Sequence, residues 1–157
     1  MDTDRWIKDL DLIPHPEGGH YREHYRSAIA SKCSDHAPSR SACTHITFLL
    51  AQGQVSRFHC VDADEIWNLY HGRGLRLWDF DPIHDTLQAV ELSIETQRFF
   101  HVIPKGHWQA GVPLGSGVLV GCTVAPGFEF QGFTLIDRAK SVRGRILERH
   151  PELEHLM

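Results

Sequence analysis

The sequence predicts an all-β protein, an antiparallel sandwich or barrel with a short helix near each end. Eight short segments have the composition of strands, and each lies between glycine, proline or aspartate residues that favour turns. No helical pattern separates these segments, which argues against the strand–helix alternation that builds a parallel sheet. The predicted strands are residues 44–51, 56–61, 65–71, 75–80, 87–92, 99–103, 108–112 and 118–124.

The first residues predict a helix and then a turn. Residues 3–10 have helical spacing, with Trp6 and Leu10 on one apolar face and Thr3 placed to cap the first turn. The prolines and glycines of residues 14–19 then predict a turn, because proline fixes φ and glycine frees it.

An additional strand is expected directly after this turn. Residues 21–26 alternate in the period of a strand, which places Tyr21, Glu23 and Tyr25 on one face. The small and polar residues 27–41 have the composition of a mobile loop.

The C-terminal part predicts a helix over residues 137–150, and Pro151 ends it. We find no internal repeat and no linker. A length of 157 residues suits one domain, residues 1–157, with its own hydrophobic core.

Composition and charge argue against several classes of partner. The net charge of −4, without a basic cluster, argues against binding to nucleic acid. The N-terminus has no apolar signal segment, and the apolar runs are too short to cross a membrane. The four cysteines have irregular spacing, which is typical of reduced thiols. We therefore expect a cytoplasmic protein with no membrane partner.

The segment from residue 53 to residue 72 has the pattern of a built site. His59 and Glu65 lie within predicted strands, between glycines at positions 53 and 72. Both side chains can bind a metal ion or move a proton. Two such groups in apolar strands predict a cavity lined by His59 and Glu65.

This spacing resembles the first motif of the cupin superfamily, G-x5-H-x-H-x3-E-x6-G. The match holds at Gly53, His59, Glu65 and Gly72, while Val61 stands in place of the second histidine.

A second, altered motif and a third phrase narrow the resemblance. The second cupin motif, P-x-G-x2-H, can be matched at Pro104 and Gly106, with Gln109 in place of the histidine. The phrase HPEGGHYREHYRS at residues 15–27, together with DADEIW around Glu65, is similar to the Cupin-5 branch of the superfamily. The resemblance covers nearly the whole chain. It implies a double-stranded β-helix, or jelly-roll barrel, that forms a homodimer and binds a small molecule inside the barrel.

The resemblance leaves a metal cofactor open. In metal-binding cupins, three histidines and one glutamate of the two motifs hold an iron, manganese, nickel or zinc ion. This chain keeps His59 and Glu65 of that set, and His107, on the same face as Gln109, is a candidate third ligand. A divalent metal at these residues is one alternative.

A metal-free site is the other alternative. Among cupins, the dTDP-sugar 3,5-epimerases use an imidazole as the base without a metal. By this resemblance His59 is the base, Glu65 its orienting partner, and Tyr21 or Tyr25 the acid. Trp67 is a candidate apolar wall. The predicted ligand-binding residues are Tyr21, Glu23, Tyr25, His59, Glu65, Trp67 and Gln109.

Purely structural interpretations stand beside these. His59 could be a hydrogen-bonded core histidine, and Trp67 could fill the core. The face of Tyr21 and Tyr25 could form an interface between protomers, and Glu17 could be a solvated residue of a turn.

Three functions are consistent with these residues. The first is a metal-independent isomerase or epimerase of a sugar or sugar nucleotide. The second is a non-catalytic ligand-binding protein or sensor. The third is a metal-dependent oxygenase. One fold hosts many chemistries, so the sequence predicts small-molecule binding more firmly than any named reaction.

Overall fold

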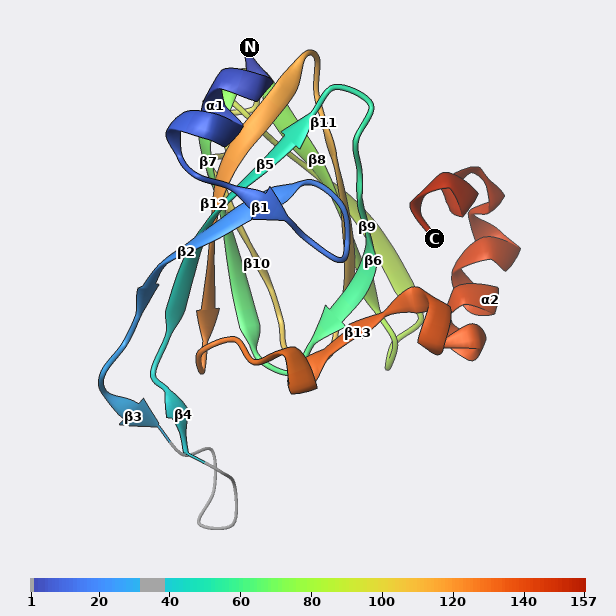
Figure 1. Cartoon of the computed structure of the whole chain (residues 1–157). Coiled ribbons are helices and arrows are strands. Elements are labelled where there is room, and N and C mark those ends of the chain that lie inside the picture. Colours follow the sequence, from blue (N-terminus) through green and yellow to red (C-terminus); the bar gives the residue numbers. More distant parts are fainter. Residues whose placement is uncertain (1, 32–38) are drawn as a thin grey trace.

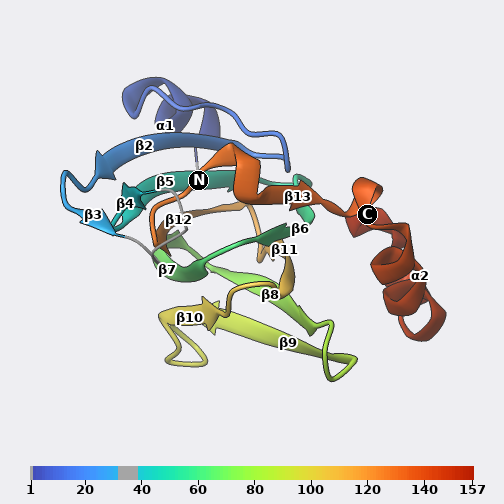
Figure 2. The same cartoon turned by 90° about the horizontal axis from the view of Figure 1, so that it is seen from below.

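The computed structural model describes residues 2–31 and 39–157. Its architecture is two antiparallel sheets that face one another and enclose the core (Figures 1 and 2). The first sheet has the order β1 (Ile13–Pro14), β2 (His20–Arg26), β5 (Thr44–Ala51), β12 (Gly117–Ala125), β7 (Asp64–Gly72), β10 (Phe100–Ile103). The second sheet has the order β13 (Phe133–Leu135), β6 (Ser56–Val61), β11 (Trp108–Pro113), β8 (Gly74–Asp81), β9 (Thr86–Ser93).

All of the strands predicted from the sequence are present, so the all-β jelly-roll prediction is confirmed. Their bounds differ by one residue at most ends, because backbone pairing continues into the flanking residues. The short strands β1 and β13 were not predicted, since two or three residues are too few to show an alternating pattern.

The loop predicted over residues 27–41 contains two short paired strands, β3 (Ala30–Ser31) and β4 (Arg40–Ser41). Residues 32–38 of the loop expected to be mobile, among them Cys33, lie outside the described residues. The other cysteines, Cys43, Cys60 and Cys122, are free thiols, as expected.

Alternation of side chains builds an apolar core in one part of the barrel. Leu75 and Leu77 of β8 point inward and are fully buried, while Trp78 and Phe80 face the opposite side of the sheet. Strand β12 is buried on both faces, because Leu119 on its outer face lies beneath the N-terminal helix.

Helix α1 (Thr3–Asp9) covers the outer face of the first sheet (Figure 1). Its apolar residues Trp6, Ile7 and Leu10 pack against buried Leu12, Leu49 and Leu119. The cap differs from the prediction. The side chain of Asp2, not Thr3, accepts a hydrogen bond from the backbone N–H of Arg5 (3.1 Å).

The C-terminal segment covers the outer face of the second sheet. The helix predicted over residues 137–150 is divided into a 3₁₀ turn (η2, Ile136–Arg138) and helix α2 (Lys140–Arg149). Pro151 ends α2 as predicted, but a further 3₁₀ helix, η3 (Pro151–Leu156), follows. Its Leu153 and Leu156 pack with Phe58 and Trp108 of the sheet. Among the described residues, no helix is long and apolar enough to cross a membrane.

Candidate functional site: a buried acid–imidazole cavity

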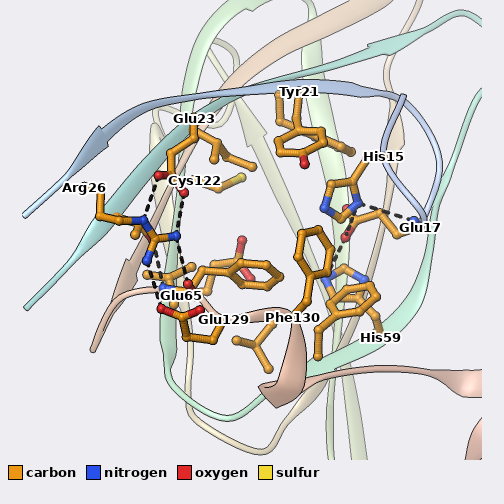
Figure 3. Close-up of a pocket in the computed structure, with 17 residues that line it drawn as sticks. His15, Glu17, Tyr21, Glu23, Arg26, His59, Glu65, Cys122, Glu129 and Phe130 are labelled. Carbon is orange, nitrogen blue, oxygen red and sulfur yellow. Dashed lines mark hydrogen bonds and ion pairs between the residues drawn. The ribbon is translucent and has the colours of Figure 1, made fainter. Parts of the chain in front are cut away.

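The inner faces of the two sheets enclose a cavity of about 130 Å³ (Figure 3). Its apolar walls are Ile46, Phe48, Val61, Val124, Phe128 and Phe133. Polar side chains lie on two opposite sides: His15, Glu17 and His59 on one, and Glu23, Arg26 and Glu129 on the other (Figure 3).

The turn between β1 and β2 carries Glu17 into the barrel. Gly18 and Gly19 have φ angles of +117° and +68°, and a Cβ atom at Gly18 would collide with the carbonyl oxygen of Val55. The glycines therefore allow the turn to lie against the start of β6, where the backbone N–H of Arg57 donates to the carbonyl oxygen of Glu17 (2.9 Å). As a result, Glu17 is only 5% exposed.

The carboxyl group of Glu17 lies between two imidazoles. Its Oε2 atom is 3.3 Å from His15 Nδ1 and 3.3 Å from His59 Nε2, and the Ser56 hydroxyl donates to its Oε1 atom (2.7 Å). His59 Nδ1 donates to the carbonyl oxygen of Arg57 (2.8 Å), so Nε2 is the nitrogen without a hydrogen in the neutral ring. The backbone N–H of Glu17 donates to His15 Nδ1 (3.3 Å), which is therefore also an acceptor.

This geometry favours a proton on Glu17, because an ionised carboxylate beside two nitrogen lone pairs would be repelled. Burial raises the pKa of Glu17 to about 8, against the opposing hydrogen bond of Ser56 and charge of Arg57. Burial also lowers the pKa of His15 to about 3, helped by the charge of His59, and lowers the pKa of His59. At neutral pH the cluster is a carboxylic acid between two uncharged imidazoles, an arrangement suited to accepting and returning a proton.

Glu65 reaches the same cavity from the start of β7, held by two buried side chains. The indole N–H of Trp67 donates to Gln109 Oε1 (2.7 Å), and Gln109 Nε2 donates to Glu65 Oε2 (2.6 Å). Because an indole N–H can only donate, it fixes the orientation of the amide. Burial raises the pKa of Glu65 to about 7, against the opposing charge of His59. Glu65 is therefore a second group that exchanges a proton near neutral pH.

Strand β2 supplies the opposite wall, and a β-bulge decides which of its side chains point inward. Tyr21 and Glu23 line the cavity, and the Tyr21 hydroxyl points into it (Figure 3). The pairing of β2 with β5 shifts register between Glu23 and Tyr25. The alternation restarts after this bulge, so that Arg26 rather than Tyr25 lines the cavity.

The Arg26 guanidinium is held in place by two carboxylates and one carbonyl. Its Nε and Nη2 atoms both donate to Glu23 (2.8 Å each), and Nη1 donates to Glu129 (3.0 Å). Nη2 also donates to the carbonyl oxygen of Phe128 (3.1 Å). These bonds tie β2 to the loop over residues 126–132, which closes one side of the cavity (Figure 3).

The structure brings together four of the residues singled out from the sequence: Tyr21, Glu23, His59 and Glu65. Tyr25 does not line the cavity and is 53% exposed, because the bulge turns it away. Trp67 and Gln109 are buried behind Glu65 instead of lining the cavity. The expected pairing of Glu65 with His59 also differs, since the Arg57 carbonyl accepts the hydrogen bond that orients His59, and the nearest carboxyl oxygen to its Nε2 atom belongs to Glu17 (3.3 Å).

His107 lies apart from this cavity. Its Nδ1 atom is 2.7 Å from Asp79 Oδ1, and its Nε2 atom is 3.8 Å from Asp81 Oδ2. Although His107 precedes Gln109 on the same face, Asp79 holds its ring.

Sequence reasoning missed His15, Glu17 and Arg26 as parts of the site. Glu17 was expected to be a solvated turn residue, but the turn folds inward. The signal was present in the pair Gly18–Gly19, because two adjacent glycines permit the close backbone approach that buries the preceding residue. Arg26 could not be found in this way, since a bulge leaves no mark in the alternating pattern.

The donor set of metal-binding cupins does not form here. Val61 presents methyl groups to the cavity, and the amide of Gln109 is committed to Trp67 and Glu65. Nε2 of His59 faces Glu17. Across residues 2–31 and 39–157, no group of three or more His, Cys, Asp or Glu side chains is arranged to hold a metal ion. The residues present therefore do not fit a metal bound in the manner of those cupins.

The two facing sheets and the enclosed polar cavity define a cupin. The chain belongs to the Cupin_5 family, described as Cupin superfamily (DUF985), whose sequence profile matches residues 4–136. It matches none of the curated protein sequences.

Solved structures agree with this assignment. The crystal structure of protein SO0799 from Shewanella oneidensis is 32% identical, with a TM-score of 0.82 over 99% of this chain and 94% of that one. A hypothetical protein from Leishmania major is 27% identical, with a TM-score of 0.80 over 98% and 95% of the two chains. Oxalate decarboxylase from Bacillus subtilis is 15% identical, with a TM-score of 0.61 over 94% of this chain and 37% of that one, a likeness of fold alone.

Proposed function

We propose that this protein is a small-molecule-binding cupin that acts as a metal-independent isomerase or epimerase on a sugar or sugar nucleotide. One observation carries the proposal. An uncharged acid–imidazole pair, Glu17 and His59, and a carboxyl group with a pKa of about 7, Glu65, line the same enclosed cavity. Isomerisation and epimerisation beside a carbonyl require a proton to be removed and returned, which such groups perform near neutral pH.

In this proposal His59 remains the base. Its Nε2 atom is the nitrogen without a hydrogen, and the Arg57 carbonyl fixes the ring. Nε2 takes the proton from the carbon next to the carbonyl group, and Glu65 is the second proton carrier. The Tyr21 hydroxyl donates a hydrogen bond to the developing oxyanion, and the surrounding phenylalanines exclude water.

The experiment measures exchange of carbon-bound hydrogen. A panel of pentoses and hexoses is incubated with the protein in D₂O, and deuterium incorporation is followed by proton NMR. We expect His59→Ala to reduce the exchange rate roughly 100-fold or more while ligand binding is retained. Tyr25→Phe, on strand β2 and outside the cavity, is the control and should leave the rate within about twofold. Undiminished exchange in His59→Ala would contradict the assignment.

A non-catalytic ligand-binding protein or sensor is the second candidate. Its support is that the carboxyl group of Glu17 lies 3.3 Å from the Nε2 atom of His59, and that Gln109 replaces a histidine with a neutral amide. The two candidates differ in outcome, because a sensor binds its sugar with no deuterium incorporation. We do not propose the metal-dependent oxygenase, since the donor set does not fit.

We also propose that the protein forms a homodimer. Strand β10 is the last in the order of its sheet, and its Phe100 and Val102 are 60% and 40% exposed. We expect Phe100→Asp to shift the sedimentation coefficient from dimer to monomer, whereas Ile83→Asp, at a position 85% exposed elsewhere, should not. A monomeric wild-type protein would contradict the proposal. A cytoplasmic location is proposed as well, supported by the free thiols.

A further inference from the structure

We propose that the cavity selects polyhydroxy molecules without negative charge, so that free sugars bind in preference to sugar acids and sugar phosphates. This inference rests on the proposed function, because it names the substrate class of the same cavity. It narrows the substrate to a free sugar, which carries the reacting carbonyl group in its open-chain form. The phosphates of a sugar nucleotide would have to remain outside the cavity.

The first argument is that no cation is free to receive an anion. Among the described residues that line the cavity, Arg26 is the only lysine or arginine. Its hydrogen bonds to Glu23, Glu129 and the Phe128 carbonyl use four of the five N–H donors of the guanidinium. With two carboxylates against one guanidinium, this side of the cavity carries an excess negative charge that repels an anion.

The second argument concerns the opposite side. There the backbone N–H of Glu17 donates to His15 Nδ1, which requires an uncharged ring, and the side chains of Glu17 and His59 are buried beside it. A carboxylate or phosphate placed beside them would lose its hydration without gaining a counter-charge, which is strongly unfavourable in a buried site.

The third argument is that the remaining polar groups suit hydroxyl and carbonyl oxygens. The Tyr21 hydroxyl points into the cavity (Figure 3) and has no hydrogen-bond partner among the described residues. The Thr44 hydroxyl accepts from the backbone N–H of Phe128 (2.9 Å) and keeps its own hydrogen to donate. Phe130 and Phe133 offer the flat apolar surfaces that pack against the carbon face of a sugar ring.

The test uses two matched series that keep the ring and change the charge. The first is D-glucose, D-glucuronate and D-glucose 6-phosphate; the second is D-galactose and D-galacturonate. Binding is measured by saturation-transfer NMR and calorimetry at pH 7. We expect a neutral member to bind at least tenfold more tightly than its acid and phosphate derivatives. Ile46→Phe, which fills the cavity, should abolish that binding without unfolding the protein.

A variant on the side of the cavity that holds Arg26 and Glu129 makes the test more specific. Glu129→Gln removes one carboxylate and should raise the affinity for the sugar acid about threefold relative to the neutral sugar. Glu95→Gln, an exposed carboxylate on a distant turn, should leave the ratio unchanged.

Each outcome decides one proposal separately. Tighter binding of a sugar acid or sugar phosphate, or no binding by either neutral sugar, overturns the charge preference. An equal response of Glu129→Gln and Glu95→Gln also counts against it. Binding of the neutral sugar without deuterium exchange contradicts the proposed isomerase but leaves the charge preference intact.

Discussion

Two buried carboxyl groups in this barrel each contact two imidazoles, yet their protonation differs. Glu17 lies between His15 and His59, and burial raises its pKa to about 8. Asp79 contacts His101 at 3.4 Å and His107 at 2.7 Å. Burial would raise its pKa too, but hydrogen bonds from His101, His107 and Gln88 outweigh it, and the pKa is lowered.

The difference lies in how far water reaches the imidazoles. The side chains of His15 and His59 are 6% and 1% exposed, whereas those of His101 and His107 are 19% and 21% exposed. A partly hydrated imidazole can carry a positive charge beside a carboxylate, and a dry one cannot. The same combination of groups therefore holds an ionised carboxylate at Asp79 and a protonated carboxylic acid at Glu17.

The largest expected effect follows from admitting water to the cavity. Phe133 packs on the rings of His15 and His59, at centroid distances of 5.7 Å and 5.4 Å. We expect Phe133→Ala to lower the free energy of unfolding by roughly 3 kcal/mol. It should also lower the pKa of Glu17 from about 8 towards its ordinary 4.5, so that Glu17 resembles Asp79. Urea denaturation and carbon-13 NMR titration measure the two quantities. Phe99→Ala, at an exposed position outside the cavity, is the control. An unchanged pKa of Glu17 in Phe133→Ala would contradict the argument that exclusion of water raises this pKa.

The next effect is a dependence of stability on pH. Glu17 binds its proton more tightly in the folded protein than in the unfolded chain. Its contribution to the free energy of unfolding is therefore present at low pH and is lost as pH rises through its folded pKa of about 8. His15 has a folded pKa of about 3, below its ordinary 6.5, so its contribution is lost as pH falls below 6.5. The two effects oppose each other below pH 6.5. Above it, we expect stability to fall by roughly 2 kcal/mol up to pH 8.

Two variants test which residue causes the fall in stability between pH 6.5 and 8. In Glu17→Gln this fall should be less than about half of the wild-type value, and the part that remains is due to Glu65. Asp79→Asn should leave it unchanged, because a group with a lowered pKa affects stability on the acid side. Urea midpoints measured from pH 5 to 9 test this, and an equal alkaline loss in wild type and Glu17→Gln would refute the assignment to Glu17.

The smallest effect concerns the orientation of Gln109. Trp67→Phe replaces the indole by a smaller phenyl ring without an N–H, so the buried amide oxygen of Gln109 loses its donor and the amide is free to rotate. We expect a cost of about 1 kcal/mol and a rise in the pKa of Glu65 above 7, because its hydrogen bond from the amide nitrogen weakens. NMR titration of Glu65 measures the shift. Trp78→Phe, on the opposite face of its sheet, controls for general loss of a tryptophan.

The fold was predictable because side chains alternate along several strands and because turn residues separate the strands. Leu75 and Leu77 in β8, and Val90 and Leu92 in β9, follow the period of two, and glycines and prolines mark the turns. The fixed spacing of His59 and Glu65 placed both in the cavity for the same reason.

The rest of the site depends on contacts between segments far apart in sequence. Glu17 is buried because its turn packs against Val55. His107 lies apart from the cavity because its ring contacts Asp79 on a neighbouring strand. The environment that raises the pKa of Glu17 is built by aromatic side chains from residues 128–133, more than a hundred positions away. A local pattern contains none of this information.

The extra residue in β2 decides which side chain this strand offers to the end of the cavity. His24 has no pairing partner on β5, so Arg26 lies opposite Thr44, which also lines the cavity. Regular pairing of the same residues would place Tyr25 opposite Thr44 and withdraw Arg26. The position of one unpaired residue therefore determines whether a guanidinium or a phenol ring lies at this end of the cavity.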